Sequence, residues 1–403
     1  MTLALAGIAL FEAVLFAHPV QRNDGQARAA SGGESRRVGA VAPDDDSDPS
    51  NRRTVQSAAA SDAQTIRALL GDTKTVAATA SLGGPFAAYD RMFDKYFPQI
   101  NAAKNPNRLN NYYDRAVVYY ARYARTGNSA FLRLAHDVVL QYRKGYLERN
   151  TYALQPHNSQ IRGLELHYRL TGDTMSRRAI AGVYGHSLSS YARKRHLANP
   201  KIDYMENRIQ ARVIQGALAA FRTGASYRRP DGLDFPASGW PALLRDALDQ
   251  TLSTQQADGS YSWAQICGGQ LNYMVGMLND VLIEYYRDFE QDPRIPVAVE
   301  KANEYLWTTQ WIPGAKAFKY ASVACSPNPF GANVGGPSPA GDLNGLLVAS
   351  FGWLYHTTRD PKWRTRGDAI FAGLVEPRWA GSYRSTKQFN QAFAESYRYL
   401  GWR

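Results

Sequence analysis

Asn, His, Arg and Tyr side chains recur in this sequence at points where apolar, helix-like segments begin. The four on which the argument depends most are Asn111, His157, Tyr204 and Arg208. Asn and Arg side chains can hold and neutralise a carboxylate, and His and Tyr side chains can accept and return a proton. These four types, if they meet in the folded chain, are suited to acid–base chemistry on a negatively charged substrate.

Further polar side chains occupy the same segment starts and continue one or two turns into otherwise apolar sequence. Capping explains about one Asn, Asp or Ser at each helix N-terminus, and it does not explain Arg, Gln, Tyr and Lys deeper in the helix. We therefore expect substrate-binding residues among them. They are Asn158, Arg162, Asn207, Arg212, Gln270, Asn272, Tyr273, Lys387 and Asn390, with Trp263 in a nearby loop.

Some of these residues have a competing structural explanation. Arg208 and Arg162 could form internal ion pairs with Glu206 and Glu165, and His157 could simply be a polar residue at a helix start. The other histidines within helix-like segments are expected to be hydrogen-bonded core residues. These are His136, His167, His186 and His356.

A short sequence motif that repeats along the chain indicates the elements that must position these residues. It reads YARTGN at 123–128, YRLTGD at 168–173 and FRTG at 221–224, with looser copies at 286–293 and 355–361. Gly after an apolar segment ends a helix in a left-handed cap, and Asp or Asp-Pro begins the next helix. A spacing of roughly 45–65 residues is near the size of a helix–turn–helix unit, which buries its apolar face only against neighbouring units.

Helices that are apolar nearly all round alternate with helices that have a single apolar stripe, as expected for inner and outer helices of stacked hairpins. The predicted pairs are 112–124 with 131–142, 161–170 with 179–191, 209–221 with 243–252, 271–286 with 297–307, and 343–355 with 363–374. Unpaired helices are expected at 64–70, 86–97 and 387–400.

This pattern predicts an all-α fold, an (α/α) toroid of about five to six helical hairpins whose ring is either complete or incomplete. Inner helices of such a ring run parallel, so their N-termini meet at one mouth and present free N–H groups there. The polar segment starts listed above are the starts of those inner helices.

The charge distribution indicates an anionic partner. The net charge is +12, and residues 1–62 carry six Arg against eight Asp and Glu, so the remainder carries +14. No run of five or more Lys and Arg occurs, and no nucleic-acid-binding signature is present. We expect an acidic glycan as the partner and no nucleic acid.

The N-terminal part differs in composition from the rest. Residues 1–20 are apolar apart from Glu12 and His18, and they lack the basic start of a standard signal peptide. We interpret them as a degenerate signal or signal-anchor segment. The alternative is a misassigned start codon. Residues 21–62 are rich in Ser, Ala, Gly, Asp and Arg and predict a disordered linker. The catalytic domain is then 63–403, and we expect it to be secreted or periplasmic, monomeric and without stable membrane insertion.

Neither a cofactor nor a metal is expected. No phosphate-cradling loop, serine nucleophile elbow or zinc ligand set occurs in the sequence. The two cysteines, Cys267 and Cys325, are compatible with one disulfide in an oxidising compartment or with two free thiols.

The layout resembles the (α/α)-toroid polysaccharide lyases, which cleave alginate, glucuronan and glycosaminoglycans. In those enzymes an Asn, a His, an Arg and a Tyr come from successive inner helices, and Asn111, His157 and Arg208 follow that order. Tyr204 lies one turn before Arg208, although the family usually has its Tyr after the Arg or on the His helix. The resemblance covers the architecture of residues 85–403 and no contiguous motif. Other candidates for the tyrosine are Tyr112, Tyr168 and Tyr273.

The resemblance implies β-elimination on a uronic-acid-containing polysaccharide, in which Asn and Arg neutralise the carboxylate and Tyr and His transfer the proton. Two alternatives remain. A glycoside hydrolase on the same fold would need two carboxylates across the scissile bond, and Asp203, Glu206 and Asp342 are the acids at the expected mouth. A non-catalytic glycan-binding protein would need the same surface without the chemistry.

Overall fold

The helices follow from the local signals in the sequence. The computed structural model describes residues 61–71, 73–102, 112–192, 206–262, 267–324 and 336–403, apart from the His157 side chain, and all of them belong to the unit Ser50–Arg403. In these residues the regular structure is helical except for two short antiparallel strand pairs, so the predicted all-α fold is confirmed. Residues 61 and 62, which we expected in the linker, are already helical.

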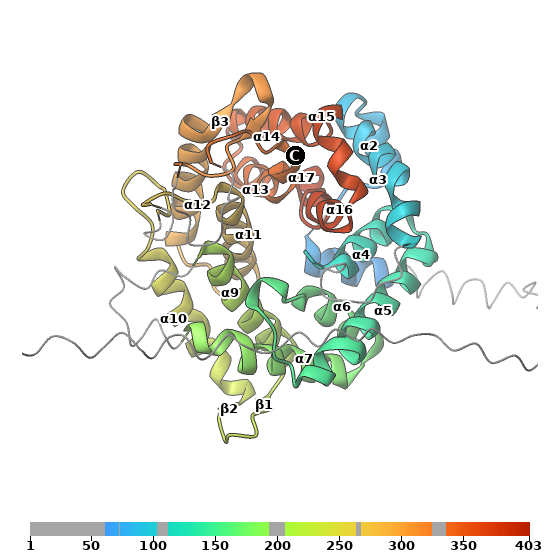
Figure 1. Cartoon of the computed structure of the whole chain (residues 1–403), viewed down its shortest axis with the longest axis vertical. Coiled ribbons are helices and arrows are strands. Elements are labelled where there is room, and N and C mark those ends of the chain that lie inside the picture. The colour runs from blue at the N-terminus through green and yellow to red at the C-terminus, as the bar shows by residue number, and fades with distance from the viewer. Residues whose placement is uncertain (1–60, 72, 103–111, 193–205, 263–266, 325–335) are drawn as a thin grey trace, which may run out of the picture. The chain divides into compact units, whose positions relative to one another are not determined.

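The helices are labelled in Figure 1. Their bounds are α2 (Val76–Ser81), α3 (Gly84–Ala102), α4 (Arg115–Thr126), α5 (Ser129–Tyr142), α6 (Ile161–Thr171), α7 (Thr174–Val183), α9 (Asn207–Thr223), α10 (Trp240–Leu252), α11 (Asn272–Asp288), α12 (Arg294–Tyr305), α13 (Val348–Thr358), α14 (Pro361–Leu374), α15 (Pro377–Ala380), α16 (Thr386–Phe393) and α17 (Tyr397–Trp402). The strands are β1 (Tyr227–Arg228), β2 (Asp234–Phe235), β3 (Trp311–Ile312) and β4 (Ala317–Phe318).

The repeated sequence motif forms the turn within each helix pair. Gly127 ends α4 with φ 70° and donates its N–H to Tyr123 O, and Gly172 ends α6 with φ 71°. The next helix is then capped by a side-chain oxygen, from Asn128 for α5 and from Asp173 for α7. Positive φ favours Gly and an Asn or Asp oxygen satisfies an unpaired N–H, so local physics alone joins the two helices of a pair.

Burial distinguishes the two helices of a pair as predicted, with one exception: the predicted outer helix 179–191 is buried at every residue from Ala179 to Gly185. In α4 the buried residues run without a break from Arg115 to Arg125, and in α11 from Asn272 to Tyr285. Their partners α5 and α12 bury one face. A helix buried all round must pack against several neighbours, and its polar side chains must find partners inside the protein.

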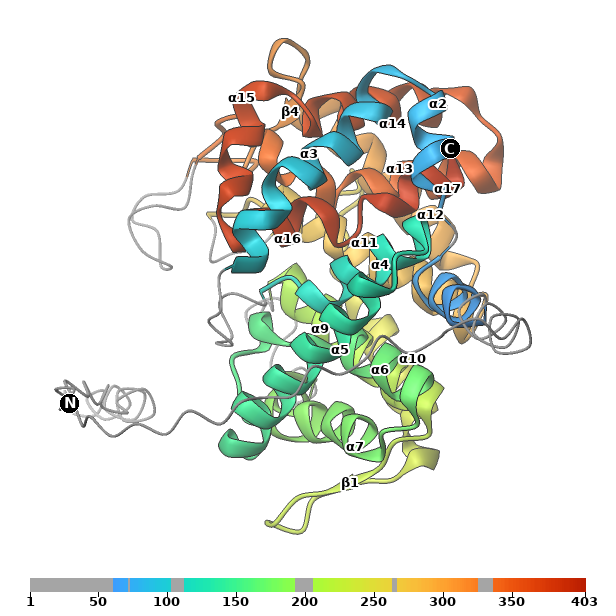
Figure 2. The ribbon, with the colours of Figure 1, turned by 90° about the vertical axis from the view of Figure 1, so that its right-hand side faces the viewer.

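The contacts between the buried helices, together with the chain connection from α16 to α17, form a closed circuit (Figure 1). Helix α4 packs against α6, α6 against α9, α9 against α11, α11 against α13, α13 against α17, and α16 packs back against α4. Each of the first five also packs against its own pair partner. Figure 2 shows α3 beside α14 and α16, and this contact joins the first and last described parts of the chain.

Two predicted helices differ in detail from the structure. The helix expected at 343–355 begins as a 3-10 helix, Gly341–Leu346, and becomes α-helical at Val348. The helix expected at 387–400 is interrupted at 394–396 between α16 and α17. Ser396 in the interruption bonds Tyr89 across the core, with 2.8 Å between the two hydroxyl oxygens. Tertiary contacts therefore override helical continuity there.

No helix in the described residues is long and apolar enough to cross a membrane. The predicted segments 1–20 and most of 21–62 lie outside those residues. Cys267 is disulfide-bonded, and Cys325 is the only other cysteine in the sequence.

Candidate functional site

Polar side chains from six separate segments meet near the points where the buried helices begin. We call this group the polar mouth; it consists of Tyr112, Tyr113, Glu206, Arg208, Tyr273, Tyr320, Asp342 and Lys387. Tyr112 and Tyr113 precede α4, Glu206 and Arg208 begin α9, and Tyr273 begins α11. These five residues each lie within three positions of a helix start, and Tyr320 follows β4.

Arg208 is the centre of the polar mouth. Its Nη1 donates a hydrogen bond to the Tyr112 hydroxyl oxygen at 2.8 Å, and its Nε and Nη2 face the Glu206 carboxylate. Burial opposes its charge, but Tyr112, Tyr273 and Glu206 outweigh burial and raise the pKa of Arg208. The guanidinium therefore remains charged, and 15% of its side chain is exposed to an incoming ligand.

A second cation, Lys387, lies over the ring of Tyr112. The Lys387 Nζ is 5.4 Å from the centre of the Tyr112 ring. Burial and the nearby Arg208 lower the pKa of Lys387, while Asp342 acts in the opposite direction. Two cations around one phenol make a positive environment in which an anionic group would be stabilised.

Three other ionisable groups of the polar mouth, Tyr113, Tyr273 and Asp342, have pKa values shifted toward their neutral forms. Burial raises the pKa of Tyr113 and of Tyr273 well above the ordinary value, so both are neutral phenols that can donate hydrogen bonds. Burial also raises the pKa of Asp342, and the charge of Lys387 partly opposes this rise. The polar mouth thus combines fixed positive charge with neutral donors.

The segment that carries the two tyrosines has an unusual backbone. Tyr113 and Asp114 have φ values of 64° and 59°, in the left-handed region that costs a residue with a side chain about 1–2 kcal/mol. Asp114 Oδ2 accepts the Gly163 N–H at 2.9 Å, and Asn390 Nδ2 donates to the Tyr112 carbonyl at 2.9 Å. Neighbouring helices therefore hold this segment in its strained conformation.

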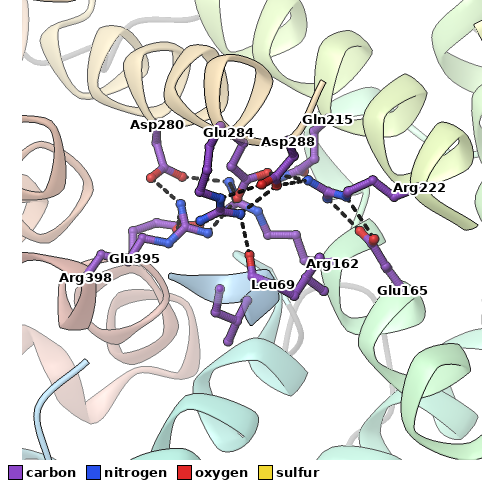
Figure 3. A network of polar contacts seen from close by, with 12 residues as sticks. Leu69, Arg162, Glu165, Gln215, Arg222, Asp280, Glu284, Asp288, Glu395 and Arg398 are labelled. Atoms are coloured by element: carbon purple, nitrogen blue, oxygen red, sulfur yellow. Dashed lines mark hydrogen bonds and ion pairs between the residues drawn. The ribbon is translucent and has the colours of Figure 1, made fainter. Parts of the chain in front are cut away.

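Below the polar mouth the buried helices are joined by ion pairs (Figure 3). Arg162 pairs with Asp280 at 2.6 Å, with Glu284 at 2.7 Å and with Glu395. Arg398 pairs with Asp280 and Glu284, each at 2.5 Å. We call these five residues the central ion network. Arg222 extends it to Glu165 and Asp288.

One carboxyl of the central ion network, that of Glu395, has a pKa raised toward its protonated form. Burial raises the pKa of Glu395 to about 8, with the carboxylates of Asp280 and Glu284 acting in the same direction against Arg162 and Arg398. Burial also opposes the charge of Asp280 and Glu284, but the two arginines outweigh it and lower their pKa values. Like charges that share a site push their pKa values apart in this way.

A cavity of about 20 Å³ separates the polar mouth from the central ion network, which is room for one water molecule. Its lining includes Tyr113, Asp114, Arg162, Arg212 and Glu395. Arg212 donates to Gln215 at 2.6 Å, and its Nε and the Asp114 Oδ1 have no hydrogen-bond partner in the described part of the chain. Burial lowers the pKa of Arg212.

The predicted site residues are placed as follows. Asn111, Tyr204 and Trp263, the alternative acid Asp203, and the His157 side chain lie outside what the structure describes. The structure brings Arg208, Tyr273 and Lys387 together in the polar mouth. Arg212 lies one layer deeper, and Arg162 deeper again, in the central ion network. Arg208 does pair with Glu206, whereas Glu165 pairs with Arg169 and Arg222 and not with Arg162.

Several predicted binding residues hold the protein itself together. Gln270 donates to Asn272 at 2.8 Å, and Asn272 donates to the Lys319 carbonyl at 2.8 Å. Asn207 donates to Gln210 at 3.0 Å. Asn390 positions Tyr112 as described above, and Asn158 is buried with its carbonyl bonded by Tyr142.

The tyrosine alternatives are separated by the fold. Tyr112 and Tyr273 lie in the polar mouth, while the Tyr168 hydroxyl, near the other end of α6, accepts a hydrogen bond from Arg177. His136, His167 and His186 each have a hydroxyl partner at 3.0 Å, but His356 is exposed, contrary to expectation, because it falls in the last turn of α13.

Sequence reasoning missed Tyr113, Asp114 and Tyr320 and the acids of the central ion network. A signal existed for two of these acids, since Asp280 and Glu284 are four residues apart within an apolar helix and so share a face. No group of His, Cys, Asp and Glu that could hold a metal ion is found in the described residues.

Comparison with known proteins gives little. No family model matches the chain, and no curated protein matches it. The crystal structure of the Lin0763 protein from Listeria innocua is similar at a TM-score of 0.45 and 12% sequence identity, over 72% of this chain and 85% of that chain. A likeness of this size carries no conclusion about activity.

Proposed function

We propose that this chain is a polysaccharide lyase that cleaves a uronic-acid-containing polysaccharide by β-elimination in the polar mouth. The observation that carries the proposal is the hydrogen bond from Arg208 to the Tyr112 hydroxyl, with Lys387 over the same ring. This arrangement supplies positive charge for a sugar carboxylate and a phenol oxygen for proton transfer within one small region.

The chemistry assigns a role to each group. Arg208 and Lys387 hold the uronate carboxylate, which makes the neighbouring C5–H bond acidic. Tyr112 acts as a phenolate whose negative charge the Arg208 guanidinium stabilises, and it becomes a neutral phenol when its oxygen takes the C5 proton. The C5–H electron pair forms the C4=C5 double bond as the C4–O bond breaks, and the Tyr112 proton passes to the leaving oxygen. Neutral Tyr113 and Tyr273 donate hydrogen bonds to the intermediate.

The residues outside the described ranges keep their proposed roles. Asn111 directly precedes Tyr112, and Tyr204 lies two positions before Glu206, so both adjoin the polar mouth along the chain. We retain Asn111 as a carboxylate-binding residue, His157 as a second proton-transfer residue and Tyr204 as an alternative to Tyr112.

The wider setting of the activity is part of the proposal. The closed circuit of helix contacts supports an (α/α) toroid, with the polar mouth at the end where the inner helices begin. The disulfide at Cys267 supports a secreted or periplasmic protein, because disulfides persist in oxidising compartments. The net charge of +12 supports an anionic polysaccharide as substrate for a monomeric enzyme.

A glycoside hydrolase is the second candidate, and one observation favours it. Burial raises the pKa of Asp342, as a general acid requires, and Glu206 supplies a second carboxyl group in the polar mouth. Glu206 is engaged by Arg208, so a hydrolase would need that ion pair to open.

The experiment is incubation of the full chain with alginate, glucuronan and hyaluronan, followed in parallel by ultraviolet absorbance, by reducing-end formation and by a binding assay. The lyase proposal requires a rise in the ultraviolet absorbance of an unsaturated uronate. New reducing ends without that absorbance would establish the hydrolase. Binding with neither product would establish a glycan-binding protein, and both of these outcomes would overturn the lyase.

A further inference from the structure

A second concave site lies far from the polar mouth. It has a volume of about 490 Å³ and is formed between the start of α7 and the β1–β2 hairpin. The hairpin follows the C-terminus of α9, whereas Arg208 is at the N-terminus of this helix of 17 residues. At 1.5 Å per residue the two sites are about 25 Å apart along α9. A ligand that fills one site leaves the other open.

Three arginines, Arg177, Arg178 and Arg228, line this site, which we call the arginine pocket. Two of them are held against aromatic rings. The Arg177 guanidinium is 5.3 Å from the Tyr168 ring centre, and the Arg178 guanidinium is 5.8 Å from that of Tyr227. A guanidinium stacked on a ring keeps its N–H edge free for a carboxylate, sulfate or phosphate and loses little freedom on binding.

The Tyr227 platform is itself fixed. Its hydroxyl oxygen is 3.0 Å from His186 Nε2, and its ring packs edge-on against Tyr152 at 5.6 Å. Tyr227 is 7% exposed although it sits at the pocket wall. Neighbours from other elements therefore hold the Tyr227 wall of the arginine pocket in place before a ligand binds.

The positive charge of the arginine pocket is not neutralised within the described residues. None of its three arginines forms an ion pair there, since the nearby acids Asp173 and Asp231 are paired with Arg143 and Arg229. Asp234 is the one acid among the lining residues. It is opposite Arg228 in the strand pair, and these two form no ion pair in the part of the chain that the structure describes. The lining thus carries an excess of two positive charges.

We infer that the arginine pocket binds a small polyhydroxy ring compound that carries at least two carboxylate, sulfate or phosphate groups. Two anionic groups match the excess charge, and the volume lies within the usual range of about 300–1,000 Å³ for small-molecule sites. Met175, 40% exposed, gives an apolar contact for the ring, and Asp234 can accept hydrogen bonds from its hydroxyls. This site does not depend on the proposed lyase activity.

The test is isothermal titration of the full chain with three probes, a uronate disaccharide, a disulfated disaccharide and a hexose bisphosphate, with inorganic sulfate for comparison. We expect at least one sugar to bind, and the affinities will show which anionic group is preferred. The double variant Arg178→Glu/Arg228→Glu should weaken that binding at least tenfold. The matched control is Arg364→Glu, an exposed arginine 5.6 Å from the Tyr355 ring, which should leave the affinity unchanged.

A variant of the polar mouth separates this site from the proposed catalytic one. Arg208→Gln should retain binding of the preferred sugar in the arginine pocket. Loss of that binding in Arg208→Gln, equal weakening in Arg364→Glu, or no binding of any of the three sugars would overturn the proposal. Sulfate binding as tight as that of the sugars would also overturn it, because a ring would then contribute nothing.

Discussion

Arg208 and Tyr112 are 96 residues apart in the sequence, and the Arg208 Nη1 donates to the Tyr112 hydroxyl oxygen at 2.8 Å. The bond joins the start of α9 to the segment before α4. Lys387, from α16, faces the ring of the same tyrosine. Three elements thus converge on one phenol group, and its removal is the most direct test of the site.

Tyr112→Phe should lower the rate of unsaturated-uronate formation by about 10²–10⁴, because proton transfer by a positioned side chain contributes that much. The measurement is initial rate by ultraviolet absorbance on the preferred polyuronate. Tyr168→Phe is the control, since its hydroxyl bonds Arg177 near the other end of α6, and it should retain the wild-type rate. Normal activity of the Tyr112→Phe enzyme would mean that Tyr204 or Tyr273, and not Tyr112, transfers the proton.

Asp342→Asn distinguishes the two enzyme classes. For a lyase the rate should change by less than about tenfold, because the only effect of the carboxyl on the proposed machinery is to raise the pKa of Lys387. For a hydrolase that uses Asp342 as its acid, turnover should fall by about 10² or more. Reducing-end assays of Asp342→Asn and Tyr112→Phe in parallel give the ranking, and a greater loss in Asp342→Asn contradicts β-elimination.

Arg398→Met should destabilise the protein by about 3–5 kcal/mol, because it leaves the buried carboxylates of Asp280 and Glu284 without one of their cations. Urea unfolding followed by circular dichroism measures the change. Arg294→Met removes an exposed pair, with 54% of the Arg294 side chain accessible, and should cost less than about 1 kcal/mol. Similar losses in both variants would show that the central ion network does not stabilise the fold.

Glu395 should make stability fall as pH rises. Its pKa is raised from 4.5 in the unfolded chain to about 8 in the folded protein, so between these values the folded state holds a proton that the unfolded state has released. The stabilisation is complete below pH 4.5 and is lost as pH rises to about 8, with a slope of up to about 1.4 kcal/mol per pH unit.

Comparison with Glu395→Gln isolates this contribution, because glutamine keeps the shape of a protonated carboxyl and does not titrate. Urea unfolding of both proteins at several pH values from 5 to 9 gives the difference. Wild type should lose stability relative to Glu395→Gln across this range. A constant difference would mean that Glu395 is already ionised in the folded protein.

Gly163→Ala should destabilise the protein by about 1–3 kcal/mol, although alanine ordinarily favours a helix. A Cβ at Gly163 would lie 2.6 Å from Asp114 Oδ1 and 2.9 Å from Ala116 Cβ. The change would push the strained segment before α4 out of place and should reduce activity as well. Gly145→Ala, where a Cβ meets nothing within 4 Å, is the control and should be neutral or stabilising in a thermal melt. Equal melting temperatures for the two variants would contradict the close packing.

Much of the helical framework was accessible from sequence because its causes are local. Gly127 and Gly172 end helices through their own φ angles, and Asn128 and Asp173 cap the next helix within two residues. The break at 394–396 was not accessible, because it is accompanied by a hydrogen bond between Ser396 and Tyr89, 307 positions away.

The sequence by itself determined the all-α class, the helix pairs and the polar starts of the buried helices, since periodicity and capping act within a few residues. Tertiary structure alone decided that Tyr112 meets Arg208, that Arg162 belongs to the central ion network and that Gln270 and Asn272 bond each other. Each of these outcomes is a choice among several possible partners for one polar group. Packing makes that choice, because a buried charge or amide takes whichever complementary group the neighbouring helices bring within hydrogen-bond reach.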